Sequence, residues 1–100
     1  MIGSAIGQQR LPLTGLPQAL TLPEGKRPQH MRVMVEGGAI RWTCGPAMEP
    51  TATDGQLEPV GAVVAPDLFL NPAIPASNQI ANFKALAVGG SATLQALFFD

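Results

Sequence analysis

Few side chains in this sequence could act as nucleophiles: Cys44 and three serines, with His30 as the only histidine. Nucleophilic catalysis needs a base in hydrogen-bond contact with the nucleophile and a third group that orients the base. In the strand pairing expected below, His30 lies one position beyond the partner of Cys44 and alternates to the opposite face. We therefore expect no catalysis, with Cys44 serving as a small buried apolar residue.

The carboxylates do not suggest a metal or glycan-cleaving site either. Glu49, Asp54 and Glu58 share a proline-rich region, but a calcium loop has acidic residues at tighter, alternating spacing. Nothing favours the carboxylate pair of a glycosidase. A single cysteine excludes an internal disulfide and any site built from several cysteines. We expect these acidic residues to be solvated loop charges, and we expect no metal, no cofactor and no enzyme activity.

One basic cluster, residues 26–32, contains Lys26, Arg27 and Arg32. Nucleic-acid binding normally needs a larger basic patch with stacking aromatic residues, and the net charge here is −1. The cluster is more typical of a charged turn that protects a sheet edge, or of a contact with an acidic partner protein. The two Gly-Gly pairs lie between expected strands, so they do not form a phosphate-binding loop before a helix.

The elements that carry these residues are predicted from alternating hydrophobicity. Gly37-Gly38 has the composition of a two-residue hairpin loop, flanked by alternating strands. This register pairs Val35 with Ile40, Val33 with Trp42 and Met31 with Cys44, all on one face.

A second hairpin is expected around Gly89-Gly90. It pairs Ala87 with Ala92, Ala85 with Leu94, Phe83 with Ala96 and Ala81 with Phe98, so that large residues meet small ones. The opposite face, with Leu86, Lys84 and Leu97 among others, is mixed and suggests cover by another segment or chain.

Further short strands are expected at 18–22, 59–65 and 68–70, with a loop at 45–55 and little or no helix. Short strands joined by proline and glycine turns predict an all-β domain, a small antiparallel β-sandwich or jelly-roll-like barrel. Residues 17–100 form this single domain. Residues 1–16 show neither helical nor sustained strand periodicity and are expected to be an extended N-terminal arm.

The arm is rich in leucine, so we expect it to dock on a neighbouring subunit. The expected protein interface combines apolar residues of the arm with the basic cluster: Ile6, Leu11, Leu13, Leu16, Lys26, Arg27 and Arg32.

Composition sets the class of protein. The 100 residues include 11 Gly and 10 Pro but only 13% charged side chains, and 46% are hydrophobic. That is too apolar for a disordered chain and sufficient for one modest core. We expect no membrane span, because no apolar run approaches about 20 residues, and no secretory signal, because a basic first segment is lacking.

Residues 33–42, VMVEGGAIRW, are followed by a Gly/Pro/Thr-rich loop and a final strand ATLQALFF at 92–99. This arrangement, over roughly residues 17–99, resembles small virion structural proteins of tailed bacteriophages, which often carry a "VEGGxxRW" hairpin and an "ATLxVxYY" strand. This chain departs in the loop, where Thr43-Cys44-Gly45-Pro46 replaces an acidic pair, and in Phe98-Phe99 instead of tyrosines.

The resemblance implies a structural protein of the virion, assembled in the host cytoplasm, most readily a capsid decoration protein that binds the major capsid protein. A neck, tail or fibre accessory component is the alternative within the same group, and a small ligand-binding β-sandwich is another. Exposed apolar surface on a low-charge protein usually marks interfaces, so we also expect a homo-oligomer, with a trimer favoured.

Overall fold

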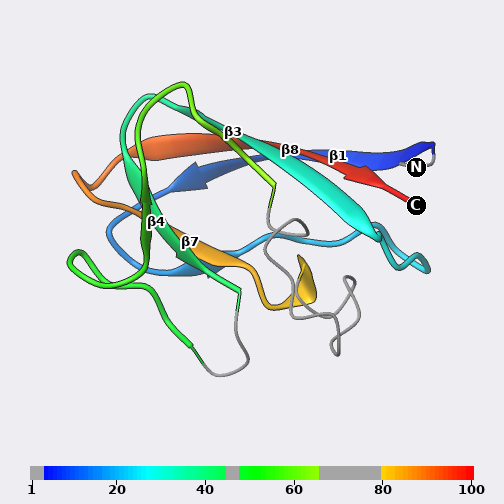
Figure 1. The fold of residues 1–100 in the computed structure, drawn as a ribbon, viewed down its shortest axis with the longest axis horizontal. Coiled ribbons are helices and arrows are strands. Elements are labelled where there is room, and N and C mark those ends of the chain that lie inside the picture. Colours follow the sequence, from blue (N-terminus) through cyan, green and yellow to red (C-terminus); the bar gives the residue numbers. More distant parts are fainter. Residues whose placement is uncertain (1–3, 45–47, 66–79) are drawn as a thin grey trace.

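The computed structural model describes residues 4–44, 48–65 and 80–100, and it places them in two antiparallel sheets (Figure 1). Sheet A has the strand order β1-β8-β3-β6, and sheet B the order β2-β7-β4-β5. The strands are β1 (Ala5–Leu13), β2 (Gln18–Ala19), β3 (His30–Glu36), β4 (Ile40–Thr43), β5 (Gln56–Glu58), β6 (Val63–Val64), β7 (Lys84–Ala87) and β8 (Ala92–Phe99). The expected all-β sandwich is confirmed.

The core lies between the two sheets and follows the alternation seen in the sequence. In sheet A, Met31, Val33 and Val35 of β3 are fully buried, as is Leu94 of β8. In sheet B, Trp42 is almost fully buried, and its ring lies 5.5 Å from that of Phe83, measured between centroids. The prediction that Trp42 faces the core is confirmed.

Both predicted hairpins are wrong, although their buried faces are right. β3 pairs with β8 and β6, whereas β4 pairs with β7 and β5, so the chain crosses from one sheet to the other at Gly37-Gly38. It crosses back between β7 and β8. Inward-facing residues alternate in the same way whether a chain turns back within a sheet or crosses to the facing sheet. The sequence pattern therefore could not separate these two outcomes.

The large-to-small matching expected within the second hairpin occurs instead between the two crossing units. Trp42 lies opposite Ala85 and Ile40 opposite Ala87 in sheet B, while Val33 lies opposite Ala96 in sheet A. Ala81, expected on a strand opposite Phe98, is exposed and precedes β7.

The two glycine pairs lie at adjacent corners of the sandwich. Gly37 and Gly90 have φ angles of +77° and +89°, which suit glycine. Gly38 has another requirement, because a Cβ there would lie 2.4 Å from the carbonyl oxygen of Ser91. The corners are also joined by a 3.0 Å hydrogen bond from the Val88 N–H to the Ala39 carbonyl. Glycine is needed here because one backbone passes close to another.

The expectation that residues 1–16 lack a sustained strand is also wrong. Ala5–Leu13 forms β1, which pairs with β8 along its length, with a bulge between Ala5 and Gly7. Proline is disfavoured inside a sheet, but Pro12 is tolerated here because β1 is the outer strand of sheet A, and an edge strand can accommodate a residue without an N–H. Edge position is set by tertiary structure, so the sequence did not reveal it.

The shorter strands agree only in part with the expected ranges. Strands β2 and β6 fall inside the ranges expected at 18–22 and 59–65 but span two residues each. Strand β5 was not expected. Residues 48–55 contain no strand, in agreement with the expected loop. The strand expected at 68–70, the remainder of that loop at 45–47 and the first three residues of the arm lie outside the described residues.

Candidate interaction surface

The residues considered for nucleophilic catalysis are separated by the fold. His30 begins β3 in sheet A, opposite Phe99, whereas Cys44 follows β4 in sheet B. Cys44 packs against the core, and burial raises the pKa of its thiol, which disfavours the reactive thiolate. Ser4 and Ser91 are exposed, at opposite ends of β8, and Ser77 lies outside the described residues. His30 and Cys44 therefore lie on different sheets and are not the nucleophile–base pair that the sequence could have offered.

Glu49 and Asp54 are exposed in the 48–55 loop as expected, whereas Glu58 lies on a strand and is half-buried. Glu49 forms an ion pair with Lys84 at 2.6 Å. Asp54 accepts a hydrogen bond from the Thr51 hydroxyl at 3.2 Å. Glu58 lies on β5 and accepts a 3.3 Å hydrogen bond from the indole N–H of Trp42. Each therefore has a structural partner, and within the described ranges no three potential metal-ligating side chains come together.

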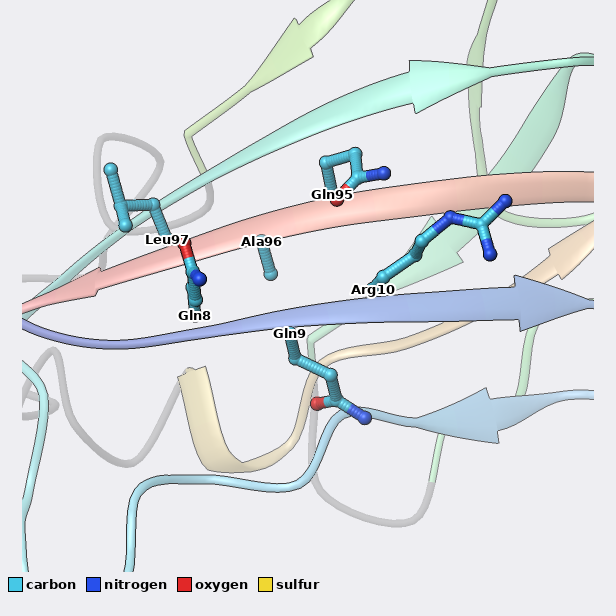
Figure 2. A pocket seen from close by; sticks show the side chains of 6 residues that line it. All are labelled: Gln8, Gln9, Arg10, Gln95, Ala96 and Leu97. Carbon is cyan, nitrogen blue, oxygen red and sulfur yellow. The ribbon is translucent and has the colours of Figure 1, made fainter.

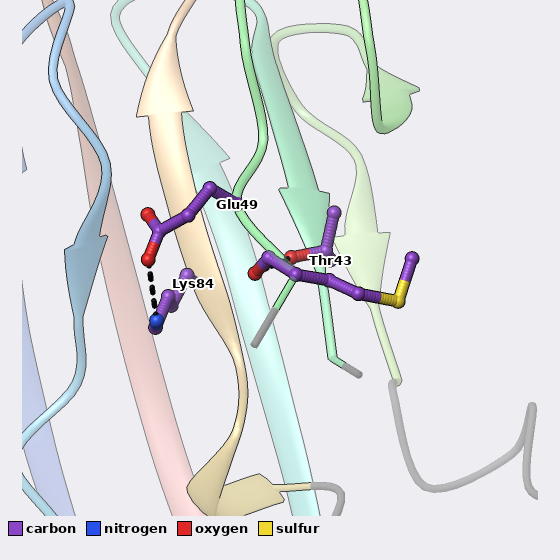
Figure 3. Close-up of polar contacts among 4 residues, drawn as sticks. Thr43, Glu49 and Lys84 are labelled. Atoms are coloured by element: carbon purple, nitrogen blue, oxygen red, sulfur yellow. Dashed lines mark hydrogen bonds and ion pairs between the residues drawn. The ribbon is translucent and has the colours of Figure 1, made fainter. Parts of the chain in front are cut away.

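The charged groups on the outer side of sheet B hold the 48–55 loop. The Arg41 guanidinium donates to the carbonyls of Ala52, at 3.1 Å, and Gly55, at 2.9 Å. The Thr43 hydroxyl donates to the Met48 carbonyl at 3.0 Å, beside the Lys84–Glu49 ion pair (Figure 3). On the outer side of sheet B, Arg41, Thr43 and Lys84 therefore form their hydrogen bonds and ion pair within the chain, which leaves fewer polar groups for contact with another protein.

Sheet A presents a different outer face. The residues that alternate away from the core on its four strands mix apolar, amide and cationic side chains. Met34 lies opposite Val63 on β6 and opposite Gln95 on β8, while Leu97 lies opposite Arg32 and Gln8. Met34, Val63 and Leu97 are 46%, 61% and 38% exposed. We call the following residues the outer face of sheet A: Gln8, Arg10, Arg32, Met34, Val63, Gln95 and Leu97. Glu36 of β3 and Thr93 of β8 lie on the same side of the sheet, beyond Met34 and Gln95.

A shallow depression of about 380 Å³ marks the β1 side of this face (Figure 2). Gln8 and Arg10 of β1 line it together with Gln95 and Leu97 of β8. Gln9 extends to the other side of β1, where its side-chain oxygen accepts a 2.7 Å hydrogen bond from the N–H of Thr21. The depression therefore offers amide and guanidinium groups beside an exposed leucine.

The cations near this face include several that the chain does not neutralise. Within residues 4–44, 48–65 and 80–100, Arg10, Lys26 and Arg27 form no ion pair, and all three are exposed. Lys26 lines a second depression together with Gln8 and Leu97, so it borders the outer face of sheet A. The Arg32 guanidinium donates to the Met31 carbonyl at 2.7 Å. The arrangement suits an apolar partner surface that carries negative charge.

The structure divides the seven expected interface residues into three groups. Leu13 is buried in the core of its own chain, and Ile6 and Leu11 pack against that core. Leu16 is 73% exposed, after the end of β1. Arg32 lies on β3, Lys26 borders the outer face of sheet A, and Arg27 is exposed in the loop before β3.

The expected list did not contain the apolar part of the outer face, Met34, Val63 and Leu97, nor Gln8 and Arg10 of β1. Alternation along the strands already placed Met34 and Leu97 away from the core and could have identified them. The expected docking of the arm on a neighbouring subunit stays a prediction.

Neither membrane-spanning helices nor similarity to known proteins indicates a role for this surface. Among the described residues, no helix is both long enough and apolar enough to cross a membrane. Comparison of the chain with models of protein families, with curated proteins and with solved structures finds no match.

Proposed function

We propose that this chain is a structural protein of a bacteriophage virion, a capsid decoration protein that attaches through the outer face of sheet A. The observation that carries the proposal is the combination of exposed Met34, Val63 and Leu97 with Arg10 and Lys26, which form no ion pair with any described residue. The likeness of residues 33–42 and 92–99 to small virion proteins supports the same role.

The architecture fits the mechanical task of such a protein. A decoration protein stabilises a shell by adding buried contact area across the seams between capsid subunits. Its side chains must then stay in fixed positions relative to one another. The outer face of sheet A meets that need because its central strands β3 and β8 are hydrogen-bonded to neighbours on both sides and stand on a fully buried layer.

The charges indicate what the partner surface contains. Arg32 lies opposite Leu97, and Leu97 lines one depression with Arg10 and another with Lys26, so a complementary capsid surface would place carboxylates beside an apolar contact. Electrostatic complementarity of this kind raises the association rate and selects the partner. Binding should therefore weaken at high salt but should not disappear, because the apolar contact remains.

The test uses capsids that lack the protein. Purified protein should bind them saturably at many equivalent sites, as seen by co-sedimentation and electron microscopy. Val63→Ser should weaken binding at least about fivefold, by loss of apolar contact. The matched control, Leu57→Ser, changes a residue that is 49% exposed on the outer side of sheet B and should bind normally.

Binding only at the portal vertex or to tails would replace decoration with a neck or tail role. Equal effects of the two substitutions would refute the assignment of the surface.

A further inference from the structure

We propose that the open edge of β1 binds the same edge of a second copy of this chain, in an antiparallel pair with a twofold axis at Gln9. The pairing joins two copies of sheet A into one continuous sheet. The inference rests on backbone geometry and does not depend on the virion assignment.

The first step is to establish which backbone groups of β1 face outward. The N–H and C=O of Val35 bond to Ala62 and Gly61, on the β6 side of β3. Because backbone groups alternate along a strand, Arg32 and Met34 face β8 and bond to Leu97 and Gln95.

The same alternation carries the argument across β8. Ala96 and Leu94 face β1, where their partners are Gln9 and Leu11. The N–H and C=O groups of Gln8 and Arg10 therefore point away from the sheet. Within the described residues, no backbone hydrogen bond to these two residues closes this edge.

The second step is the length of this open edge. On one side, the bulge between Ala5 and Gly7 interrupts the regular strand. On the other, Pro12 has no N–H to donate. Two outward N–H groups remain, those of Gln8 and Arg10, one on each side of Gln9. Gln9 itself is held inward by its hydrogen bond with Thr21, so its side chain does not cover the edge.

The third step is the register. An antiparallel second copy can place Gln8 opposite Arg10 and Arg10 opposite Gln8, so that all four outward N–H groups meet carbonyls. A shift by one pair sets Arg10 against Arg10, where like charges repel. A shift in the other direction sets Arg10 against the bulge at Ile6. The central register is the one that uses every open donor, and it lets the Gln8 amide oxygen accept from the guanidinium of the partner.

A twofold pair would place two outer faces of sheet A side by side. A partner with repeated binding sites would then be held by two linked surfaces. The second binding event becomes intramolecular, so the pair attaches more tightly than one copy does, although each copy makes the same contacts. A twofold pair also differs from the trimer expected from the sequence, so the mass in solution decides between them.

Sedimentation equilibrium over a concentration series tests the proposal. The protein should show a monomer–dimer equilibrium. Arg10→Pro removes the outward N–H at position 10, and with it two of the four symmetric bonds, so dimerisation should weaken at least about tenfold. The matched control, Arg10→Gln, keeps the N–H and loses only the guanidinium contact with Gln8 of the second copy, so it should weaken dimerisation much less than Arg10→Pro does. Gln8→Glu should strengthen the dimer through its pairing with the arginine of the partner.

A cross-linking experiment checks the register even if Arg10→Pro perturbs folding. Gln9 would face its own copy across a pair that is not hydrogen-bonded, with Cα atoms about 4.5 Å apart, within reach of a disulfide. In a Cys44→Ser background, Gln9→Cys should form a disulfide dimer under mild oxidation, faster than the control Gln95→Cys on the neighbouring strand. Monomers at every concentration, a trimer mass, or equal cross-linking of the two variants would overturn the proposal.

Discussion

Gly38→Ala should destabilise the protein through a backbone collision at the two corners where the chain changes sheets. The new Cβ would lie 2.4 Å from the Ser91 carbonyl oxygen and 3.7 Å from the Cβ of Ala92. Real Cβ atoms essentially never approach below 3.0 Å, so one corner must move by at least the difference, 0.6 Å. Backbone cannot rotate away as a side chain can, and Ala92 begins the paired strand β8. Overpacking of this kind costs about 1–3 kcal/mol.

The expected change is measurable by thermal and urea unfolding. A 100-residue domain loses about 5 °C of Tm per kcal/mol, so Gly38→Ala should lower the Tm by about 5–15 °C. Fluorescence of Trp42, the single tryptophan, reports unfolding because the residue is only 5% exposed in the folded protein.

Gly89→Ala is the matched control. Gly89 belongs to the other glycine pair, has no atom within 4 Å of a new Cβ, and does not have a positive φ angle. It should change stability by less than about 0.5 kcal/mol, or raise it slightly through the entropy of the unfolded chain. If the two variants unfold alike, the corners are not adjacent in solution and the crossing topology is wrong.

Three further substitutions or measurements test other parts of the structure. Leu94→Ala removes a fully buried side chain of β8 and should cost about 2–5 kcal/mol of unfolding free energy, measured by urea denaturation; a cost below 1 kcal/mol would contradict its central position. Arg41→Ala removes the hydrogen bonds to two loop carbonyls and should therefore increase proteolytic cleavage within residues 48–55. The control Glu49→Gln removes only an exposed ion pair and should change the free energy of unfolding by less than about 1 kcal/mol. Equal cleavage of the two variants would refute the role of Arg41. The raised pKa of Cys44 predicts slow alkylation at neutral pH that accelerates on unfolding. The folded state favours the protonated thiol, so the thiol contributes fully to stability below its unfolded-state pKa, and this contribution is lost as the pH rises through its folded-state pKa. Cys44→Ser should therefore reduce the loss of stability in alkaline solution. An unchanged dependence of stability on pH would contradict the burial of the thiol.

Much of the fold could be predicted from local pattern. Alternation identified which side chains of β3, β4 and β8 face the core, and the scarcity of helix-compatible windows excluded a helical domain. Strand pairing could not be predicted, because Val33 opposite Trp42 and Val33 opposite Ala96 both place a valine on a buried face. Backbone hydrogen bonds join residues far apart in sequence, and a single sequence carries no direct signal of them.

The candidate surface was predicted in part. Arg32 lies on the outer face of sheet A and Lys26 borders it, but Arg32 is on β3, a central strand, so it does not protect a sheet edge as expected. Leu13 was expected at an interface because nothing local showed that its segment packs on β8. Gln8 and Arg10 became relevant once β1 was placed at the edge.

By itself, the sequence determined the two-residue alternation, the glycine pairs and the low charge. These fixed an all-β class and the inner face of each main strand, because side-chain direction follows from the local backbone alone. Only the tertiary structure decided that the glycine pairs carry the chain between sheets, that residues 5–13 form an edge strand, and that Arg10 and Arg32 share the outer face of sheet A with exposed apolar residues. Each of these depends on which distant strand lies alongside, and that is settled by the packing of the whole chain.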